Sequence, residues 1–128
     1  MVGMNNSEAT PELLDQVHLR EVLELMGEDE ESGAFARWIV RLDTELAQFR
    51  ALLATDNKIA SLPEIAKATH SLRGTCLMMG ASALACLFAE LEVHAKAGNR
   101  ADVDELYAGS RELEQASLHA LREAEAKY

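Results

Sequence analysis

Residues 61–80 of the chain, SLPEIAKATHSLRGTCLMMG, decide its fold. The segment opens with a capping box, in which Ser61 is followed three residues later by Glu64, and Pro63 suits the first turn of a helix. Apolar and small residues then recur at steps of 4, 3, 4 and 3 residues until Gly80, a residue type that commonly ends helices. This spacing is the period of one helix face and predicts an amphipathic helix. The residues of that face are Ile65, Thr69, Leu72, Cys76 and Met79.

The same period recurs on both sides of this segment. Residues 34–54 carry apolar residues at steps of 4, 3, 4, 3 and 4, and residues 84–95 carry a further apolar stripe. A last stripe runs from a second capping box at Asp102 to the C-terminus, and residues 11–26 predict a short leading helix. No segment alternates with a period of two residues. The pattern indicates the all-α class, as an antiparallel up-down four-helix bundle with a short additional N-terminal helix. The last stripe comprises Val103, Leu106, Ser110, Leu113, Ser117 and Leu121.

Length and composition fit one compact domain. The 128 residues are 48% hydrophobic and 27% charged, which provides enough apolar material for a core. Residues 11–128 are therefore expected to form a single bundle domain, and residues 1–10 a flexible N-terminus. No apolar run approaches the roughly 18–20 uncharged residues of a bilayer span, so direct membrane insertion is not expected.

Charge and cysteine content narrow the classes of partner and the compartment. Twelve basic residues against 22 acidic ones give a net charge of −10. Such a domain repels phosphate backbones, so nucleic-acid binding is not expected. Cys76 and Cys86 form no CxxC motif and fall in apolar helical patterns. They are expected to be reduced, buried thiols, which indicates a cytoplasmic protein.

One of the four histidines has unusual neighbours. His70 follows the face residue Thr69, so it lies at the edge of the apolar stripe. Gly74, one turn later, costs about 1 kcal/mol relative to alanine in mid-helix and leaves the surface beside the imidazole bare. Lys67 and Arg73 place positive charge around it in an acidic domain. An exposed imidazole with these neighbours is a candidate nucleophile toward a phosphoryl group.

Other interpretations of these residues stay open at this point. Gly74 would equally permit close packing of two helices. A metal site would need pairs of ligands at helical spacing, and the chain offers only Glu90 with His94, so no metal ion is expected. His18 and His119 have no distinctive neighbours and are expected to be ordinary surface side chains.

The residues around His70 also resemble a known family. The run from His70 to Ala81, followed by Leu84 and by Leu91-Glu92, is similar to the histidine-containing phosphotransfer (HPt) domain. That family carries Ala-His-x-Leu-Lys-Gly-Ser-Ser, then a hydrophobic-Gly-Ala step, and then a leucine helix that ends in Leu-Glu. The chain departs from this pattern mildly, and the basic residue before the glycine is kept. The departures are Thr69, Arg73, Thr75 and Cys76.

The resemblance implies a phosphorelay intermediate. His70 would accept a phosphoryl group, on Nε2, from the aspartate of a response-regulator receiver domain and pass it to the aspartate of another receiver. Arg73 would neutralise phosphoryl oxygens, and Gly74 would admit the acidic pocket of the receiver. Among the supporting residues, Lys96 would be a second cation and Glu92 would orient the imidazole. Lys67 would steer the partner, and Leu77 would belong to the docking surface. The Thr75 hydroxyl would form a hydrogen bond near the imidazole or to the preceding turn.

The resemblance also sets expectations for activity and partners. The chain has no Gly-rich phosphate loop, so it is expected to be a phosphocarrier without ATP-binding or autokinase activity, and not an enzyme. No cofactor is expected, because Mg²⁺ would sit on the partner receiver. The partners would be response-regulator receivers, a hybrid sensor histidine kinase, or both. In the case of a hybrid kinase, the domain would form the cytosolic tail of that membrane-anchored protein. The domain is expected to be a monomer. Two alternatives stay open, namely a non-catalytic HPt-like module that docks receivers or another regulator without carrying phosphate, and a purely structural bundle.

Overall fold

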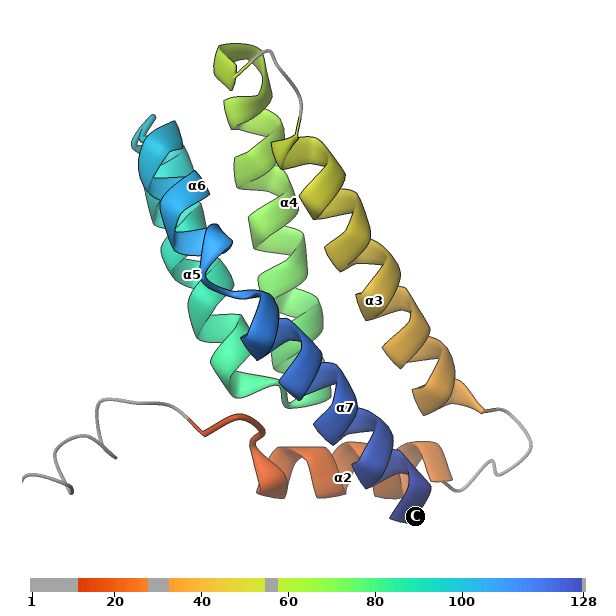
Figure 1. The fold of residues 1–128 in the computed structure, drawn as a ribbon. Coiled ribbons are helices and arrows are strands. Elements are labelled where there is room, and N and C mark those ends of the chain that lie inside the picture. Colours follow the sequence, from red (N-terminus) through yellow and green to blue (C-terminus); the bar gives the residue numbers. More distant parts are fainter. Residues whose placement is uncertain (1–11, 28–32, 55–57, 128) are drawn as a thin grey trace, which may run out of the picture.

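Helices joined by short turns make up most of the residues that the structure describes (Figure 1). The computed structural model describes residues 12–27, 33–54 and 58–127. Six helices and no strand occur in these ranges, which confirms the all-α class predicted from the sequence. The expected flexible segment 1–10 lies outside the described residues. The helices are α2 (Gln16–Gly27), α3 (Ala34–Leu53), α4 (Lys58–Met79), α5 (Ser82–Lys96), α6 (Arg100–Ala108) and α7 (Arg111–Lys127).

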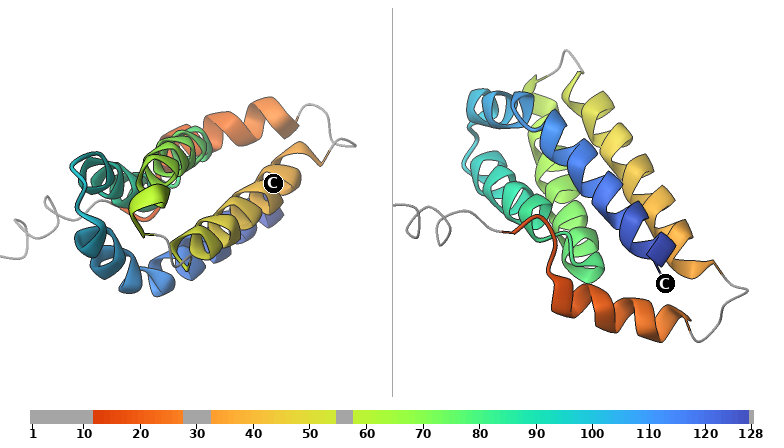
Figure 2. Two further views of the ribbon diagram at one scale, coloured as in Figure 1. Left: turned by 90° about the horizontal axis from the view of Figure 1, so that it is seen from above. Right: turned by 60° about the horizontal axis from the view of Figure 1, so that its bottom comes forward.

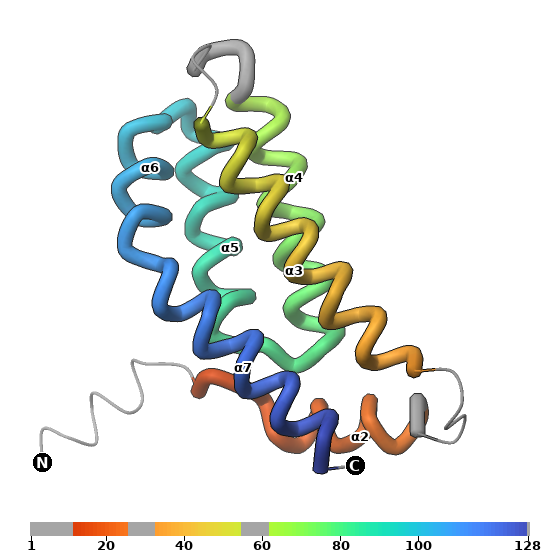
Figure 3. The backbone as a smooth tube through the Cα atoms, turned by 45° about the vertical axis from the view of Figure 1, so that its right-hand side comes forward, coloured from red at the N-terminus to blue at the C-terminus, as the bar shows by residue number. Residues whose placement is uncertain are grey.

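The long helices run alongside one another, and α2 crosses one end of them (Figures 1 and 2). Helix α4 packs most extensively on α5, while α3 packs on α4 and α7. The short helix α6 lies at the end opposite α2, between α5 and α7 along the chain (Figure 3). Over the described residues, none of the helices combines the length and the apolar character needed to cross a bilayer.

The apolar stripes of the helices meet in one core. All five residues of the predicted face of α4 are buried. The four residues of the predicted α5 stripe are also buried, namely Leu84, Leu87, Leu91 and Ala95. Phe49 of α3 packs edge-on against Phe88 of α5 and Tyr107 of α6, with ring centroids 5.4 Å and 5.0 Å apart. Such aromatic pairs add about 0.5–1.5 kcal/mol beyond area burial. The helical period therefore located the core faces of α4 and α5 correctly.

Helix α4 begins earlier than the sequence pattern predicts. Its first residue is Lys58, so the capping-box position Ser61 lies inside the helix and does not start it. Pro63 falls in the second turn, where its missing N–H removes one backbone hydrogen bond. The side chain of Ser61 is outside the described residues.

The predicted last helix is wrong in one respect, because it is broken into α6 and α7. Gly109 ends α6, and the Ser110 hydroxyl donates to the Tyr107 carbonyl at 2.6 Å while the Ser110 carbonyl accepts from the Glu114 N–H at 3.0 Å. Ser110 thus caps a new helix. The break shifts the buried face to Tyr107 and Glu114, which replace the predicted Leu106 and Leu113. Helix α6 starts at Arg100, before the predicted box at Asp102.

Helix α2 is fastened to the turn between α4 and α5. Asp15 precedes the helix and caps it, since its Oδ1 accepts the His18 backbone N–H at 3.1 Å. The Asp15 N–H donates to the Gly80 carbonyl at 2.7 Å, and His18 Nε2 lies 2.8 Å from the Met78 carbonyl oxygen. Gly80 has a positive φ of 80°. These contacts hold α2 across the end of the bundle, and the helix begins at Gln16, later than the predicted start near residue 11.

Replacing Gly80 by alanine is expected to destabilise the domain by about 1–3 kcal/mol. The left-handed backbone conformation costs an L-residue roughly 1–2 kcal/mol. In addition, a Cβ at Gly80 would lie 3.3 Å from both the Asp15 carbonyl oxygen and the Leu19 Cβ. Urea denaturation measures the loss. The matched control is Gly98→Ala, which has the same φ of 80° but no neighbour within 4 Å of the added Cβ. An equal loss of free energy of unfolding in both variants would show that the close contact of Gly80 with Asp15 and Leu19 does not contribute to the effect.

The two cysteines differ in their surroundings. Cys76 is buried in the core, and burial raises the pKa of its thiol to about 12, with the nearby carboxylates of Glu45 and Glu114 adding to the shift. Cys86 is exposed on α5. The expectation of two buried thiols is therefore wrong for Cys86, because this residue lies on the outer side of α5, next to the buried Ala85 and Leu87 in sequence.

Candidate functional site

The imidazole of His70 stands on the outer surface of α4. The preceding residue Thr69 is fully buried, whereas 65% of the His70 side chain is exposed. One residue is a rotation of about 100° around a helix, so a side chain next to the core face reaches the surface. The structure thus places His70 at the edge of the apolar stripe, as the sequence predicts.

Gly74 leaves open space beside the imidazole. A Cβ built at this position would meet no atom within 4 Å outside its own local helix. The interpretation that Gly74 permits close packing of two helices is therefore wrong. The glycine lowers the stability of the helix, and no neighbouring helix packs against it. Its effect is to leave the surface of α4 without a side chain one turn beyond His70.

A buried carboxylate from α5 holds the imidazole. Glu92 Oε2 lies 3.0 Å from His70 Nδ1 and 2.9 Å from Lys96 Nζ, and Glu92 Oε1 lies 3.8 Å from Arg73 Nε. Only 7% of the Glu92 side chain is exposed. The hydrogen bond from Lys96, followed by that from His70, lowers the pKa of Glu92 below its ordinary value, against the opposing effect of burial. Glu92 is thus an ionised group that joins the imidazole to two cations.

This arrangement assigns the two ring nitrogens of His70. A nitrogen 3.0 Å from an ionised carboxylate oxygen carries the proton and donates it, so Nδ1 is the N–H of the neutral ring. Arg73 Nη2 lies 3.4 Å from the same nitrogen and cannot donate to it in this tautomer. Nε2 is then left with its lone pair, and within the described part of the chain it has no hydrogen-bond partner. The nucleophilic nitrogen of the exposed ring is Nε2.

The other predicted residues surround this site with one exception. Lys67 is exposed one turn before His70 and forms no ion pair with a described residue. Leu77 is 57% exposed, on the same side of α4 as His70 and Arg73. The Thr75 hydroxyl donates to the Ser71 carbonyl at 3.2 Å, so it bonds to the preceding turn and not near the imidazole. Val93, which directly follows Glu92, is 65% exposed, and nothing in the sequence pattern indicated it.

The remaining histidines lie elsewhere and have local partners. His18 contacts the Met78 carbonyl, which the sequence did not indicate. His94 Nδ1 lies 3.9 Å from Asp102 Oδ2, and His119 Nε2 lies 3.4 Å from Glu123 Oε1. In the described ranges, no three His, Cys, Asp or Glu side chains are grouped so that they could hold a metal ion.

The stability of the domain is expected to depend on pH through Glu92. Its pKa in the fold lies below the ordinary value of 4.5, so the ionised form stabilises the fold fully above that value, and the contribution is lost as the pH falls through the lowered pKa. The difference in free energy of unfolding between wild type and Glu92→Gln should therefore be largest near neutral pH and shrink as the pH falls below about 4.5. Urea denaturation measures it. Glu90→Gln, at an exposed position of α5, is the matched control, and an equal pH dependence in the two variants would contradict the assignment.

Comparison with known protein families gives the class of protein. A scan of protein-family models matches the Hpt domain over residues 34–124, a range that includes α3 to α6 and most of α7. The chain therefore belongs to the family of histidine-containing phosphotransfer domains, as the residues around His70 predict. Searches of curated proteins and of solved structures find no match. Hpt domains are phosphocarriers of two-component signalling that interact with receivers and kinases, so this domain has a phosphotransfer role in such a system.

Proposed function

We propose that Nε2 of His70 accepts a phosphoryl group from the aspartate of one response-regulator receiver and passes it to the aspartate of another. The observation that carries this proposal is the hydrogen bond of 3.0 Å between His70 Nδ1 and the buried carboxylate of Glu92. It fixes the ring in the tautomer whose lone pair lies on Nε2. The ring is exposed, and the neighbouring position Gly74 leaves room for a second protein.

The transfer step needs no proton movement within this domain. Nε2 forms a bond to phosphorus while the bond from phosphorus to the aspartate oxygen breaks, and that oxygen keeps the electron pair as a carboxylate. Nδ1 keeps its proton, and the positive charge that develops on the ring is offset by the ionised Glu92 beside it. In the return step, neutral imidazole leaves and the second aspartate takes the phosphoryl group. Glu92 therefore orients the ring and supports both directions.

The cations of the site have separate roles in this proposal. Arg73 and Lys96 both contact Glu92 and flank the imidazole, so either can offset charge on phosphoryl oxygens at Nε2. The exposed Lys67 attracts the acidic pocket of the receiver at longer range. Mg²⁺ would belong to the receiver, and the domain would use no cofactor of its own and would not phosphorylate itself from ATP. We expect it to act as a cytoplasmic monomer, alone or as the tail of a hybrid kinase, with exposed Leu77 in the docking surface.

The test uses a receiver domain that has been phosphorylated by a small phosphodonor. The purified domain is mixed with it, and the label that appears on the domain is located by mass spectrometry. Labelling at His70 that is labile in acid and stable in base supports the proposal. A receiver that binds without labelling the domain would instead support a non-catalytic docking module. Labelling at another histidine would refute the assignment of His70.

A further inference from the structure

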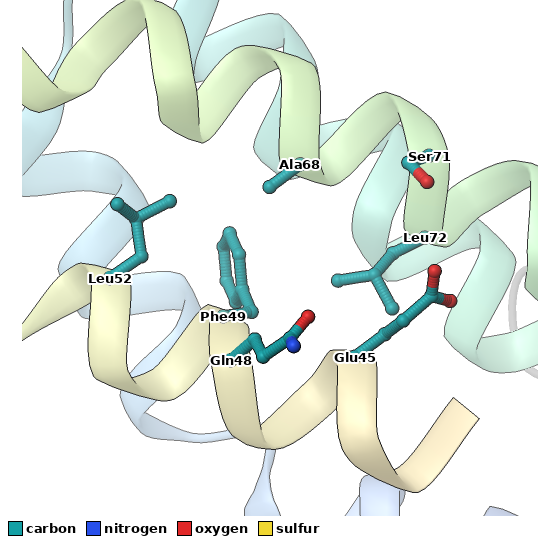
Figure 4. A pocket seen from close by; sticks show the side chains of 7 residues that line it. All are labelled: Glu45, Gln48, Phe49, Leu52, Ala68, Ser71 and Leu72. Atoms are coloured by element: carbon teal, nitrogen blue, oxygen red, sulfur yellow. The ribbon is translucent and has the colours of Figure 1, made fainter. Parts of the chain in front are cut away.

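A groove lies between α3 and α4 (Figure 4). Its volume is about 250 Å³. That is below the range of roughly 300–1,000 Å³ for sites of drug-sized ligands, so the groove suits a single side chain. We refer to it as the α3–α4 groove. Its apolar walls include Phe49, Leu52 and Leu72, and its polar rim is formed by Glu45, Gln48 and Ser71.

Glu45, on the rim of this groove, has one carboxylate oxygen without a hydrogen-bond partner in the described residues. Figure 4 shows the side chain of Glu45 extending from α3 toward Ser71 and Leu72 on α4. Among the described residues, Glu45 Oε1 is buried without a hydrogen-bond partner, and Oε2 lies 3.7 Å from Arg41 Nε, while 20% of the Glu45 side chain is exposed. A buried charged oxygen without a donor is costly. The groove therefore offers a place where a donor from another molecule would be favoured.

The α3–α4 groove lies on the side of α4 that faces α3, within the span of a standard protein interface that is centred on His70. Ser71 on the groove rim directly follows His70, which is a rise of about 1.5 Å along α4 and a rotation of about 100° around it. An α-helix with its side chains is about 10–12 Å across. A standard protein interface buries about 800 Å² on each partner, which is much wider than one helix. A receiver seated over Gly74 and His70 would thus also contact the opposite flank of α4.

We propose that the α3–α4 groove receives a lysine or arginine side chain of the receiver that docks over His70. The apolar walls would cover the methylene stem, and the partly exposed carboxylate of Glu45 would accept a hydrogen bond from the charged head. The net charge of −10 further favours a cationic group over an anionic one. This inference rests on the proposed phosphotransfer at His70 and adds a determinant of which receivers are accepted.

The experiment compares Glu45→Gln with the wild-type domain, using the receiver that labels the wild type fastest in a panel of phosphorylated receivers. Glutamine keeps the shape of the side chain and removes its charge. The receiver concentration for half-maximal transfer should rise about threefold to tenfold, while the maximal rate stays unchanged because Glu45 does not touch the reacting atoms. Glu105→Gln, at an exposed position of α6, is the matched control and should behave as the wild type.

A second measurement identifies the partner group. Each basic residue of the receiver is replaced by alanine, and each variant is tested against the wild-type domain and against Glu45→Gln. One replacement should weaken docking to the wild type and have little further effect with Glu45→Gln. The inference is overturned if no replacement shows this coupling, or if Glu45→Gln and Glu105→Gln give equal shifts. If no receiver labels the wild-type domain, the proposed function is refuted as well. If receivers label the wild type and Glu45→Gln needs the same receiver concentration for half-maximal transfer, only the inference about the groove is refuted.

Discussion

Replacement of His70 by glutamine is expected to abolish phosphoryl transfer to the domain, by at least about a thousandfold, while the fold stays intact. Glutamine has no nitrogen lone pair that can form a bond to phosphorus, so the acceptor itself is lost. The side chain is largely exposed, and its removal leaves no cavity in the core. The measurement is the rate at which label passes from a phosphorylated receiver, together with the helical signal in circular dichroism and the free energy of unfolding.

The controls for this variant are the histidines outside the site. His94→Gln and His119→Gln remove exposed or half-exposed rings that pair with Asp102 and Glu123, respectively. Both variants should accept label at the wild-type rate. Label that persists on His70→Gln would show that another residue is the acceptor, and the proposed function would then be wrong.

Replacement of Gly74 by glutamine is expected to slow transfer strongly and at the same time to stabilise the domain. The free energy of unfolding should rise by up to about 1 kcal/mol, because glutamine is a much better helix former than glycine and its side chain meets open space. The same side chain would occupy the gap beside His70 and keep the receiver away from Nε2. A displacement of about 1 Å in a reacting pair can cost about a hundredfold in rate, and we expect a loss of at least that size.

Gly74→Ala separates the two effects. Alanine gives the full helix stabilisation of about 1 kcal/mol but fills much less of the gap, so its transfer rate should lie between those of the wild type and of Gly74→Gln. Stability is measured by urea denaturation and transfer by the label assay. A Gly74→Gln variant that is less stable than the wild type, or that transfers phosphate at the wild-type rate, would contradict the role given to this glycine.

The sequence predicted the parts of the fold in which burial follows an unbroken helical period. In α4 the spacing from Ile65 to Met79 corresponds to a buried face because every residue of it points to the same core. The break at Ser110 could not be seen in this way, because the apolar period continues across it. The residue is buried, as the stripe predicts, but its hydroxyl and carbonyl cap two adjoining helices. A hydroxyl that caps a helix and one that packs in a core look alike in sequence.

The residues of the candidate site also differ in whether the sequence could reveal them. His70 and Gly74 could be found from the sequence because each is unusual for its own position on one helix. Glu92 and Lys96 lie on another helix, and only the family resemblance indicated them. The unpaired oxygen of Glu45 could not be predicted at all, since it depends on the distance between α3 and α4. Features that depend on the contact between two helices can be predicted only when the packing of those helices is known.

The extensive contact between α4 and α5 has a consequence for local opening of the domain. Helices open independently when few packed contacts hold them, and α2 contacts its neighbours far less than α4 contacts α5. The imidazole and the carboxylate that orients it both lie on the most tightly joined pair. Fraying of α2 or of the end of α7 is therefore expected to leave His70 and Glu92 in contact.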